Sequence, residues 1–295
     1  MTAPVHVERL RALLAQRQSR QRPMLSVPGC WDALTALLIE QAGMEAAFLT
    51  GGGLSMARLG RPDLGLTTAS ELVDAVMTIR DRVALPLIVD GDTGFGGTLN
   101  LQRTLRLLER AGASAVQIED QGFPKRCGHL AGKTVVPLDQ ALGRLRGALD
   151  TRESMLVIAR TDAVAIEGLD AALDRAEAYL AEGADLVFVE GAPTMKGVIT
   201  VAERFANRCP LVHNLVEGGV SGTDDGNALD DLGYAIALHP LLLMHGLAHA
   251  APAWLAHLKQ EKSTVALRGQ LSALADMNRI TGAAELLDLG AHYEG

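Results

Sequence analysis

Aromatic residues and excess positive charge are both scarce in this chain. Only 3% of its 295 residues are Phe, Trp or Tyr, and the net charge at pH 7 is −8. The sequence therefore offers neither a cationic surface for a phosphate backbone nor enough rings to stack on bases. We expect no nucleic-acid partner.

Long apolar runs and paired cysteines are also missing. No stretch is apolar and uncharged for long enough to span a bilayer, so we expect no membrane partner. Residues 1–22 carry five arginines without an uninterrupted apolar run, which predicts an exposed helix rather than a signal peptide. The three cysteines, Cys30, Cys127 and Cys209, are odd in number and widely spaced, which is typical of reduced thiols in a cytoplasm.

What the chain does contain is a recurring alternation of strand and helix patterns. Hydrophobic residues make up 48% of the sequence, enough for a large core. Short apolar runs without polar alternation, as in buried parallel strands, occur at 24–27, 46–50, 86–90, 115–119, 155–160, 186–190, 210–214 and 234–239. Helical patterns between them include 33–42, 70–81, 98–111, 138–149, 169–182 and 194–206.

Eight strand and helix units in one chain predict a (β/α)8 TIM-type barrel with extra terminal helices. A doubly wound parallel sheet is the alternative. Polar residues follow nearly every predicted strand, a pattern that a barrel collects around one mouth. No low-complexity linker interrupts the series, so we expect residues 1–295 to form a single domain with a helical extension from about 241.

Carboxylates follow two neighbouring strands of the predicted barrel. Asp90 and Asp92 flank Gly91 at the end of the third strand, and Glu119 ends the fourth. Hard oxygen ligands of this kind suit Mg²⁺ held largely through water. Aspartates that cap a turn are the alternative. Two acidic strand ends side by side favour the metal site.

A cysteine between cations follows the fourth strand. Cys127 is preceded by Lys125 and Arg126 and followed by Gly128 and His129. Nearby positive charge favours the thiolate, so we predict a reactive thiol here. Cys30 and Cys209 have no such neighbours and are interpreted as small buried hydrophobic residues.

Further polar residues end other strands. Arg160 at a barrel mouth can clamp a substrate carboxylate with two hydrogen bonds. Glu190 and Asn214 end the next two strands. After the second strand, Thr50 precedes the three glycines at 51–53, whose amides either approach an anion closely or form an ordinary turn.

Taken together, these motifs resemble the isocitrate lyase and phosphoenolpyruvate mutase superfamily from about Ser26 to Pro240. The most specific match is Lys-Arg-Cys-Gly-His at 125–129. Other matches lie at 31–33 (Trp-Asp-Ala), 62–65 (Pro-Asp-Leu-Gly), 90–92 (Asp-Gly-Asp), 118–121 (Ile-Glu-Asp-Gln), 159–162 (Ala-Arg-Thr-Asp) and 214–219 (Asn-Leu-Val-Glu-Gly-Gly).

The resemblance implies an α/β barrel whose last helix is swapped between subunits, usually in a homotetramer, with Mg²⁺, or in its place Mn²⁺, at the mouth. It also implies the role of each site residue. By this resemblance, the residues that would hold the metal and its waters are Asp90, Asp92 and Glu119, with Asp63 close by. The residues that would bind a carboxylate substrate are Thr50, Gly51, Gly52, Gly128, His129, Arg160 and Asn214. The catalytic residues would be Cys127, Arg160, Glu190 and Asp63, with Cys127 as the acid that protonates the carbanionic product.

Several positions depart from the methylisocitrate lyase branch. His245 stands where that branch has one arginine for an extra carboxylate, and a second such arginine is either replaced by Gln270 or displaced to Arg268. Phe48 replaces a frequent tyrosine. Asp224 and Asp225 either repel a substrate carboxylate or face solvent. These departures argue against a tricarboxylate substrate.

The sequence thus predicts a cytoplasmic, Mg²⁺-dependent lyase that splits a 2-hydroxy dicarboxylate of the substituted malate type into a 2-keto acid and a second carboxylic acid. Alternatives within the same site are carboxyphosphonoenolpyruvate-type phosphonate mutation, oxaloacetate hydrolysis or decarboxylation, and methylisocitrate cleavage. A non-catalytic barrel that senses a keto acid is a further alternative. A pure binding protein has no need of the Cys127 thiol, which argues against the sensor.

Overall fold

The computed structural model describes residues 3–128 and 130–294. The chain divides into two compact units, the first ending at Leu242 and the second beginning at Leu243.

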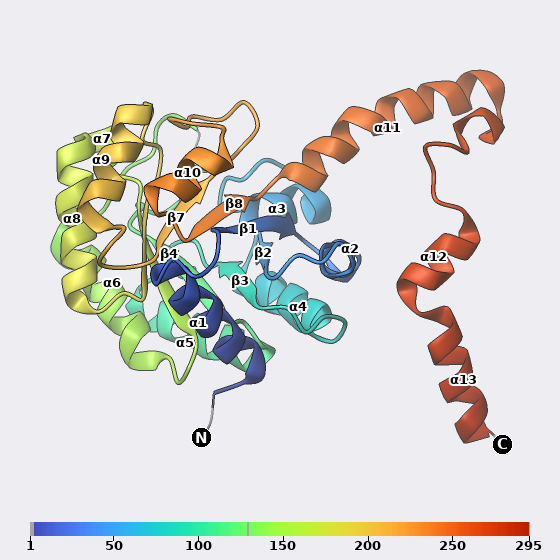
Figure 1. Ribbon diagram of the computed structural model, residues 1–295, viewed down its shortest axis with the longest axis horizontal. Helices are drawn as coiled ribbons and strands as arrows, with labels where there is room; N and C mark the ends of the chain where they lie inside the picture. Colours follow the sequence, from blue (N-terminus) through green and yellow to red (C-terminus); the bar gives the residue numbers. More distant parts are fainter. Residues whose placement is uncertain (1–2, 129, 295) are drawn as a thin grey trace. The chain divides into compact units, whose positions relative to one another are not determined.

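Eight parallel strands of the first unit close into a barrel in sequence order (Figure 1). The strands are β1 Leu25–Cys30, β2 Ala47–Leu49, β3 Leu87–Asp90, β4 Ala115–Glu119, β5 Leu156–Thr161, β6 Leu186–Val189, β7 Leu211–Asn214 and β8 Ile236–His239. The ring closes between β1 and β8, where Val27 pairs in register with Leu238. The predicted (β/α)8 barrel is therefore confirmed over the doubly wound sheet.

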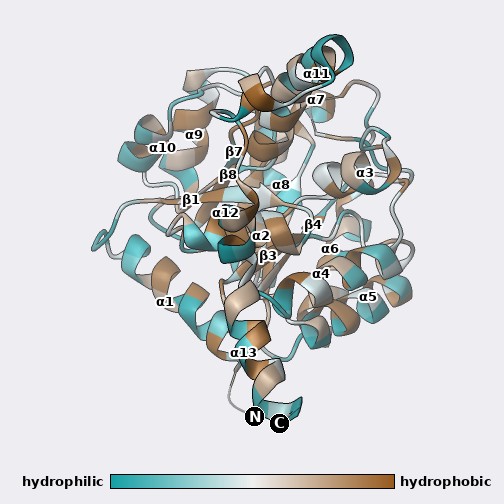
Figure 2. Cartoon of the chain, turned by 90° about the vertical axis from the view of Figure 1, so that its right-hand side faces the viewer, coloured by the Kyte–Doolittle hydropathy of each residue, from teal (hydrophilic) through white to brown (hydrophobic). Residues whose placement is uncertain are grey.

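Helices surround this barrel, and the spacing of their apolar residues explains which face of each helix is buried. In α5, Thr98–Ala111, the buried leucines 101, 105 and 108 lie on one face, and Gly112 ends the helix at φ 105°. Figure 2 shows the resulting alternation of hydrophobic and hydrophilic residues along α1, α4 and α5. The remaining helices of this unit are α1 Val5–Gln18, α2 Ala33–Gln41, α3 Gly51–Leu59, α4 Ala69–Arg80, α6 Leu138–Thr151, α7 Val164–Glu167, α8 Leu169–Glu182, α9 Met195–Phe205 and α10 Gly226–Leu232.

The helix at the start of the chain is not exposed, contrary to the expectation from its arginines. Leu10, Leu13 and Leu14 of α1 are buried in the same cluster as Val27 and Ile88 inside the barrel. The spacing of these leucines, with Val7, gives α1 one apolar face. We infer that α1 covers the amino-terminal end of the barrel, so the opposite mouth is the open one.

The first strand also extends further than expected. The apolar run predicts an end at 27, and the proline and glycine that follow usually interrupt strands. In the structure β1 continues to Cys30, with Pro28 paired to His239 and Gly29 paired to Phe48. A Cβ on Gly29 would lie only 2.0 Å from the Pro240 carbonyl oxygen. Glycine at 29 is thus required by close packing at the barrel seam.

The second unit is helical. Its helices are α11 Leu242–Glu261, a short 3-10 helix at Val265–Leu267, α12 Leu274–Thr281 and α13 Ala283–Glu294. The first residue of α11, Leu242, is the last residue of the first unit. Within it the Trp254 indole donates a hydrogen bond to Gln270 Oε1 at 2.9 Å. No helix in the described parts of the chain is both long and apolar enough to cross a membrane.

Candidate active site

A glycine-rich helix start forms one side of the barrel mouth. Thr50 follows β2 and caps α3, where its hydroxyl accepts a hydrogen bond from the Gly53 amide at 3.2 Å. The three glycines are therefore the first turn of a helix rather than an ordinary loop. The Gly51 amide lies 3.4 Å from Asp90 Oδ2, and a Cβ on Gly52 would contact Asp63. A helix N-terminus with bare backbone attracts anions.

Buried carboxylates face this helix start. Asp90 ends β3 and Glu119 ends β4, and Asp92 lies just beyond β3 at φ 48°. All three side chains are buried, and the Gln117 amide donates a hydrogen bond to Asp90 at 3.2 Å. Burial raises the pKa of Asp92 to about 7 and raises the pKa of Glu119 above its usual range, against the opposing charges of Lys125 and Arg160. The cluster therefore favours an added positive charge.

Lys125 supplies part of that charge. Its ammonium lies 2.5 Å from Asp63 Oδ1 and 2.6 Å from Asp92 Oδ1, and its side chain is only 4% exposed. Burial alone would lower the pKa of Lys125, but the carboxylates, Asp92 foremost, raise it above its usual range. Lys125 is thus a fixed cation.

The donor set also fits a divalent cation. In the described part of the chain, Glu119 Oε1 is buried without a hydrogen-bond partner, which is expected of an oxygen that coordinates a bound ion. Among the same residues, no three His, Cys, Asp or Glu side chains converge as direct ligands of one ion. Mg²⁺ is commonly bound through one or two carboxylates and several waters, so it does not need three direct ligands.

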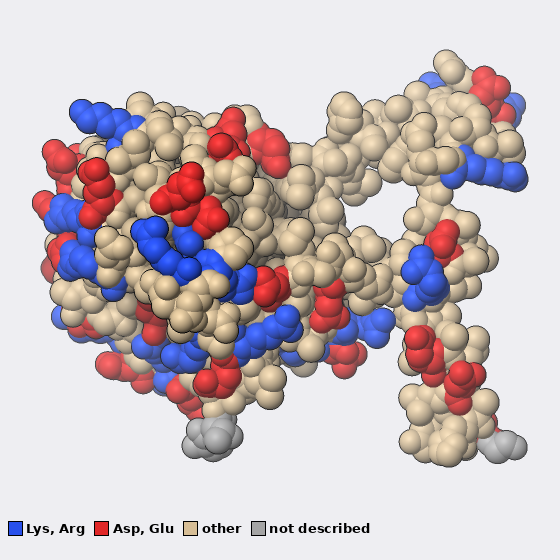
Figure 3. All heavy atoms as spheres, in the orientation of Figure 1, with Lys and Arg blue, Asp and Glu red and all other residues tan. Residues whose placement is uncertain are grey.

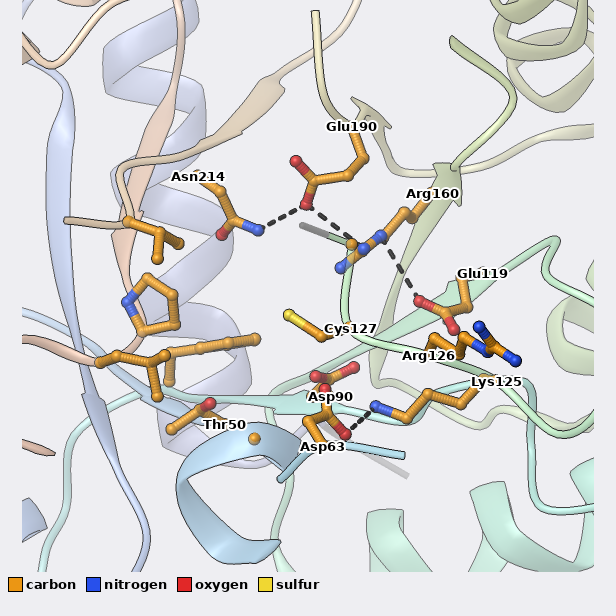
Figure 4. Close-up of a pocket in the computed structure, with 16 residues that line it drawn as sticks. Thr50, Asp63, Asp90, Glu119, Lys125, Arg126, Cys127, Arg160, Glu190 and Asn214 are labelled. Atoms are coloured by element: carbon orange, nitrogen blue, oxygen red, sulfur yellow. Dashed lines mark hydrogen bonds and ion pairs between the residues drawn. The ribbon is translucent and has the colours of Figure 1, made fainter. Parts of the chain in front are cut away.

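Arg160 is held by carboxylates from three directions. Its guanidinium lies 2.8 Å from Asp162, 3.3 Å from Glu190 and 3.4 Å from Glu119. The Asn214 side chain extends this series of contacts by donating a hydrogen bond to Glu190 at 2.6 Å. Figure 4 shows this line of polar contacts along one wall of the pocket. The predicted substrate clamp is therefore already oriented by the protein.

Cys127 lies between the carboxylates around Lys125 and the residues around Arg160. Its amide donates a hydrogen bond to the Asp63 carbonyl at 3.1 Å. In Figure 4 the sulfur points into the pocket, between the pair Glu190 and Asn214 and the carboxylate of Asp90. The neighbouring cations have other contacts, Lys125 with carboxylates and Arg126 with the Ala131 carbonyl. The reactive thiolate therefore stays a prediction.

The other two cysteines are buried, as interpreted from the sequence. Burial raises the pKa of Cys30 far above its usual range and that of Cys209 to about 11, so both are neutral thiols.

One pocket gathers most of the predicted site residues. Its lining includes Thr50, Gly52, Asp63, Asp90, Glu119, Cys127, Gly128, Arg160, Glu190 and Asn214. Asp92 and Gly51 are not part of this lining, but they contact two residues that are, Lys125 and Asp90 respectively. His129 lies outside the described residues. Asp225 is exposed and caps α10, so the solvent-facing interpretation is the right one.

Sequence reasoning missed two parts of the site. An apolar wall is formed by Phe48, Val216, Pro240 and Leu241. The sequence also did not predict the buried ion pairs of Lys125 with Asp63 and Asp92, or those of Asp162 with Lys133 and Arg160. A signal was available, because acidic residues buried at several strand ends need buried cations near them.

Comparisons with known proteins identify the family of this chain. The sequence model of the family described as phosphoenolpyruvate phosphomutase matches residues 14–251. The chain is 33% identical to a 2,3-dimethylmalate lyase of Eubacterium barkeri over 290 residues, covering 97% of each chain. It is 36% identical to a 2-methylisocitrate lyase of Bacillus subtilis over 271 residues, covering 92% of this chain and 86% of the relative.

Solved structures give the same result. An oxaloacetate acetylhydrolase bound to the inhibitor 3,3-difluorooxalacetate matches with a TM-score of 0.92 and 29% identity, covering 100% of this chain and 99% of that one. A 2,3-dimethylmalate lyase, described as a PEP mutase/isocitrate lyase superfamily member, matches with a TM-score of 0.90 and 30% identity, covering 100% and 97%. The chain therefore belongs to the phosphoenolpyruvate mutase and isocitrate lyase family of enzymes.

Proposed function

We propose that this protein is a Mg²⁺-dependent lyase that cleaves a carbon–carbon bond in a 2-hydroxy dicarboxylate of the substituted malate type. The products are a 2-keto acid and a second carboxylic acid. The observation that carries the proposal is the position of the Cys127 thiol in one pocket with Arg160, the buried carboxylates and an apolar wall. The lyase relatives named above support the reaction class.

The metal belongs at the carboxylate cluster. We assign it to Asp90, Asp92 and Glu119, with Asp63 near its waters, because their oxygens are hard donors and Glu119 Oε1 has no partner among the described residues. When bound, Mg²⁺, or Mn²⁺ in its place, neutralises charge on the substrate's hydroxyl and carboxylate oxygens.

The protein's own groups bind the rest of the substrate. The amides of Gly51 and Gly52 at the start of α3 face a carboxylate, with the Thr50 hydroxyl beside them. Arg160 and Asn214 contact the substrate from the opposite wall, where Asn214 Oδ1 is buried and has no hydrogen-bond partner in the described chain. Gly128 and His129 complete the substrate contacts in this proposal.

The bond cleavage balances with one proton in and one proton out. The substrate's hydroxyl gives its proton to water in the pocket, and its oxygen forms the keto group while the carbon–carbon bond breaks. The electron pair leaves with the second fragment as a carbanion conjugated with its carboxylate, which hydrogen-bond donors stabilise. The Cys127 thiol then donates its proton to that carbon. Arg160 and Glu190 orient the reacting fragments.

The apolar wall favours an alkyl-substituted substrate. Phe48, Val216, Pro240 and Leu241 present hydrocarbon to the pocket. A third carboxylate placed there would lose its water without gaining a partner, which costs several kcal/mol. We therefore favour a substituted malate over methylisocitrate, in agreement with the sequence departures at Phe48 and His245.

The test is release of a 2-keto acid in the presence and absence of Mg²⁺. The panel contains malate, 2-alkylmalates, 2,3-dimethylmalate, methylisocitrate, oxaloacetate and phosphonopyruvate. We expect turnover of a substituted malate, and we expect Cys127→Ser to abolish it while leaving ligand affinity within about twofold, since the lost S–H is a proton donor rather than a binding group. Cys209→Ser, a change at a buried cysteine away from the pocket, is the matched control.

Two outcomes of the panel would replace the proposal. The structural likeness to oxaloacetate acetylhydrolase makes oxaloacetate hydrolysis the second candidate, and turnover of oxaloacetate alone would establish it. A phosphorus NMR change with a phosphonate alone would indicate mutase chemistry. Binding of a keto acid without any turnover would favour a sensor.

We also propose that the chain is a cytoplasmic homotetramer. The cytoplasmic assignment is supported by the wide spacing and odd number of its three cysteines. The oligomer is supported by α11, which has no buried residue among those the structure describes and carries no Asp, Glu, Lys or Arg from Leu242 to Leu258. On the face that Figure 3 shows, α11 is uncharged along most of its length, and charged atoms gather at its carboxyl-terminal end. Apolar helix faces of this kind are usually covered in an assembly.

A further inference from the structure

A buried lysine follows Cys127 and joins two parts of the site. The Lys133 side chain is 4% exposed, and its ammonium lies 2.9 Å from Asp162 Oδ1. The same ammonium donates a hydrogen bond to the Gly128 carbonyl at 2.5 Å. Lys133 therefore connects the backbone beside Cys127 to the residue that follows β5.

Asp162 is itself a fixed anchor. Its backbone amide donates to Asp120 at 2.9 Å, and Asp120 also accepts from the hydroxyls of Thr161 at 2.7 Å and Tyr179 at 2.8 Å. Burial would raise the pKa of Asp162, but the charges of Arg160 and Lys133 outweigh it and lower the pKa to about 2. The carboxylate stays ionised at any ordinary pH.

Both oxygens of Asp162 are used. Oδ2 accepts from Arg160 Nε at 2.8 Å, and Oδ1 accepts from Arg160 Nη2 at 3.1 Å as well as from Lys133. One carboxylate thus fixes the plane of the Arg160 guanidinium and the end of the Lys133 side chain together. Two such contacts leave little rotational freedom to either cation.

Gly128 lies directly against the groups that Asp162 orients. A Cβ at this position would be 2.4 Å from Arg160 Nη2 and 3.0 Å from Glu190 Cγ. The backbone next to Cys127 therefore packs on the Arg160 and Glu190 side chains without an intervening gap. On the other side, the Cys127 amide is held by the Asp63 carbonyl.

We propose that Asp162 and Lys133 are positioning residues, which hold Cys127 over the pocket and keep Arg160 aligned with it. The proposal rests on the proposed lyase function only for the role of the thiol as proton donor. Its structural part, that Lys133 keeps the backbone at Gly128 against Arg160, stands independently of the reaction. Neither residue needs to touch the substrate.

The first test measures access to the Cys127 thiol and needs no substrate. Cys30 and Cys209 are buried, so a soluble alkylating reagent reports on Cys127 in the folded protein. Lys133→Met keeps the side-chain length and leaves Asp162 paired with Arg160, so no uncompensated charge is created. We expect alkylation to be about tenfold faster, because a charge-assisted hydrogen bond is lost.

Matched variants separate this effect from a general loss of structure. Lys196→Met removes an exposed lysine on α9 and should leave the alkylation rate unchanged. Lys133→Arg retains a cation and should restore most of the protection. If Lys133→Met unfolds the protein, Asp162→Asn offers the same test with no change in shape. An alkylation rate equal to that of the unmodified protein in folded Lys133→Met, or in folded Asp162→Asn, would overturn the proposal.

The second test uses the active substrate of the panel. A positioning role predicts that Lys133→Met lowers kcat by about tenfold or more and changes KM by less than about threefold, because the proton donor is displaced while the binding groups stay. A rise in KM with kcat unchanged would instead place Lys133 in substrate binding. If no compound in the panel turns over, the lyase proposal fails while the alkylation result still decides the positioning role.

Discussion

Buried cations at the barrel mouth are each shared by several carboxylates. Lys125 contacts Asp63 and Asp92, and Arg160 contacts Glu119, Asp162 and Glu190. Ion pairs removed from water contribute to stability only when their geometry is good and their remaining hydrogen bonds are satisfied. Here they fix the direction of each functional side chain before any substrate binds.

Replacing Arg160 by lysine tests this arrangement. An ammonium has no planar fork and cannot reproduce the paired contacts of Arg160 Nε and Nη2 with Asp162. We expect kcat/KM to fall by about 100-fold, the effect of losing one or two charge-assisted contacts. Steady-state kinetics on the substrate identified by the panel measures it.

The matched change Arg204→Lys, at a half-exposed ion pair on α9, should leave kcat/KM within about twofold. Retention of full activity in Arg160→Lys would contradict the role given to the guanidinium.

At the scale of single elements, close backbone packing at the barrel seam sets a strict limit on residue size. Gly29 in β1 lies against Pro240, which follows β8 and lines the pocket. Gly29→Ala forces the two strands apart, and we expect a loss of about 2–3 kcal/mol in the free energy of unfolding. Denaturant titration measures the loss.

The control for this substitution is Gly143→Ala. Gly143 lies inside α6, where an added Cβ meets nothing within 4 Å. Alanine there should stabilise the protein by about 0.5–1 kcal/mol, because glycine is unfavourable in a helix. Equal effects of the two substitutions would refute the packing argument.

Helix α1 contributes a titrating group at the other end of the barrel. His6 Nδ1 lies 2.8 Å from the hydroxyl of buried Ser114, which also accepts from the Leu87 amide. Burial, and secondly the charge of Arg80, lower the pKa of His6 to about 4. Below its ordinary pKa of 6.5 the unfolded chain binds this proton more readily, so stability should fall as the pH drops from 6.5 to 4.

His6→Gln removes this titration. We expect the variant to show a shallower loss of stability than the original protein over the same pH window, measured by denaturant unfolding at several pH values. Because His6 is only half-buried, solvent screening reduces the size of this difference in stability but does not change its sign. Parallel pH profiles of the two proteins would show that His6 is not the responsible group.

Elements with strong local signals could be predicted from the sequence. The bounds of β4, α5 and α8 are those expected, because each combines an apolar pattern with a clear terminal residue such as Gly112 or Gly183. The extension of β1 through Pro28 and Gly29 could not be predicted, since it depends on contact with β8, far along the chain. The buried face of α1 was present in its leucine spacing but was outweighed by its arginines.

The candidate site divides in the same way. The strand-end position of Asp90, Glu119 and Arg160 follows from the order of strands in a barrel. The pairing of Lys125 with Asp63, 62 residues apart, depends on tertiary folding and has no local signal. The apolar wall was missed for the same reason, because Phe48 and Leu241 come from opposite ends of the barrel sequence.

At the scale of the whole molecule, the two units differ in how far their apolar side chains are buried. The barrel buries its hydrophobic residues in internal clusters. Among the described residues of the second unit, α11, α12 and α13 contain no buried side chain, and leucines 255, 286 and 287 are 65%, 66% and 73% exposed. Exposed apolar surface of this extent is typical of a protein interface.

The tetramer proposal can be tested in solution. We expect sedimentation at about four times the chain mass of 31.2 kDa. The double variant Leu255→Glu/Leu258→Glu should shift the protein to a smaller species, because charge on α11 opposes burial in an interface. Leu99→Glu, at a residue 81% exposed on α5, should not. A monomer in the unmodified protein would contradict the proposal.

The central claim is carbon–carbon cleavage of a substituted malate with proton delivery to the departing fragment. The most direct measurement is ¹H NMR of the products from 2,3-dimethylmalate in D₂O with Mg²⁺. We predict equal amounts of pyruvate and a second carboxylic acid carrying one deuterium at the carbon that was bonded to the keto acid. Unchanged substrate alongside turnover of a phosphonate or of oxaloacetate, or products in unequal amounts, would contradict the account.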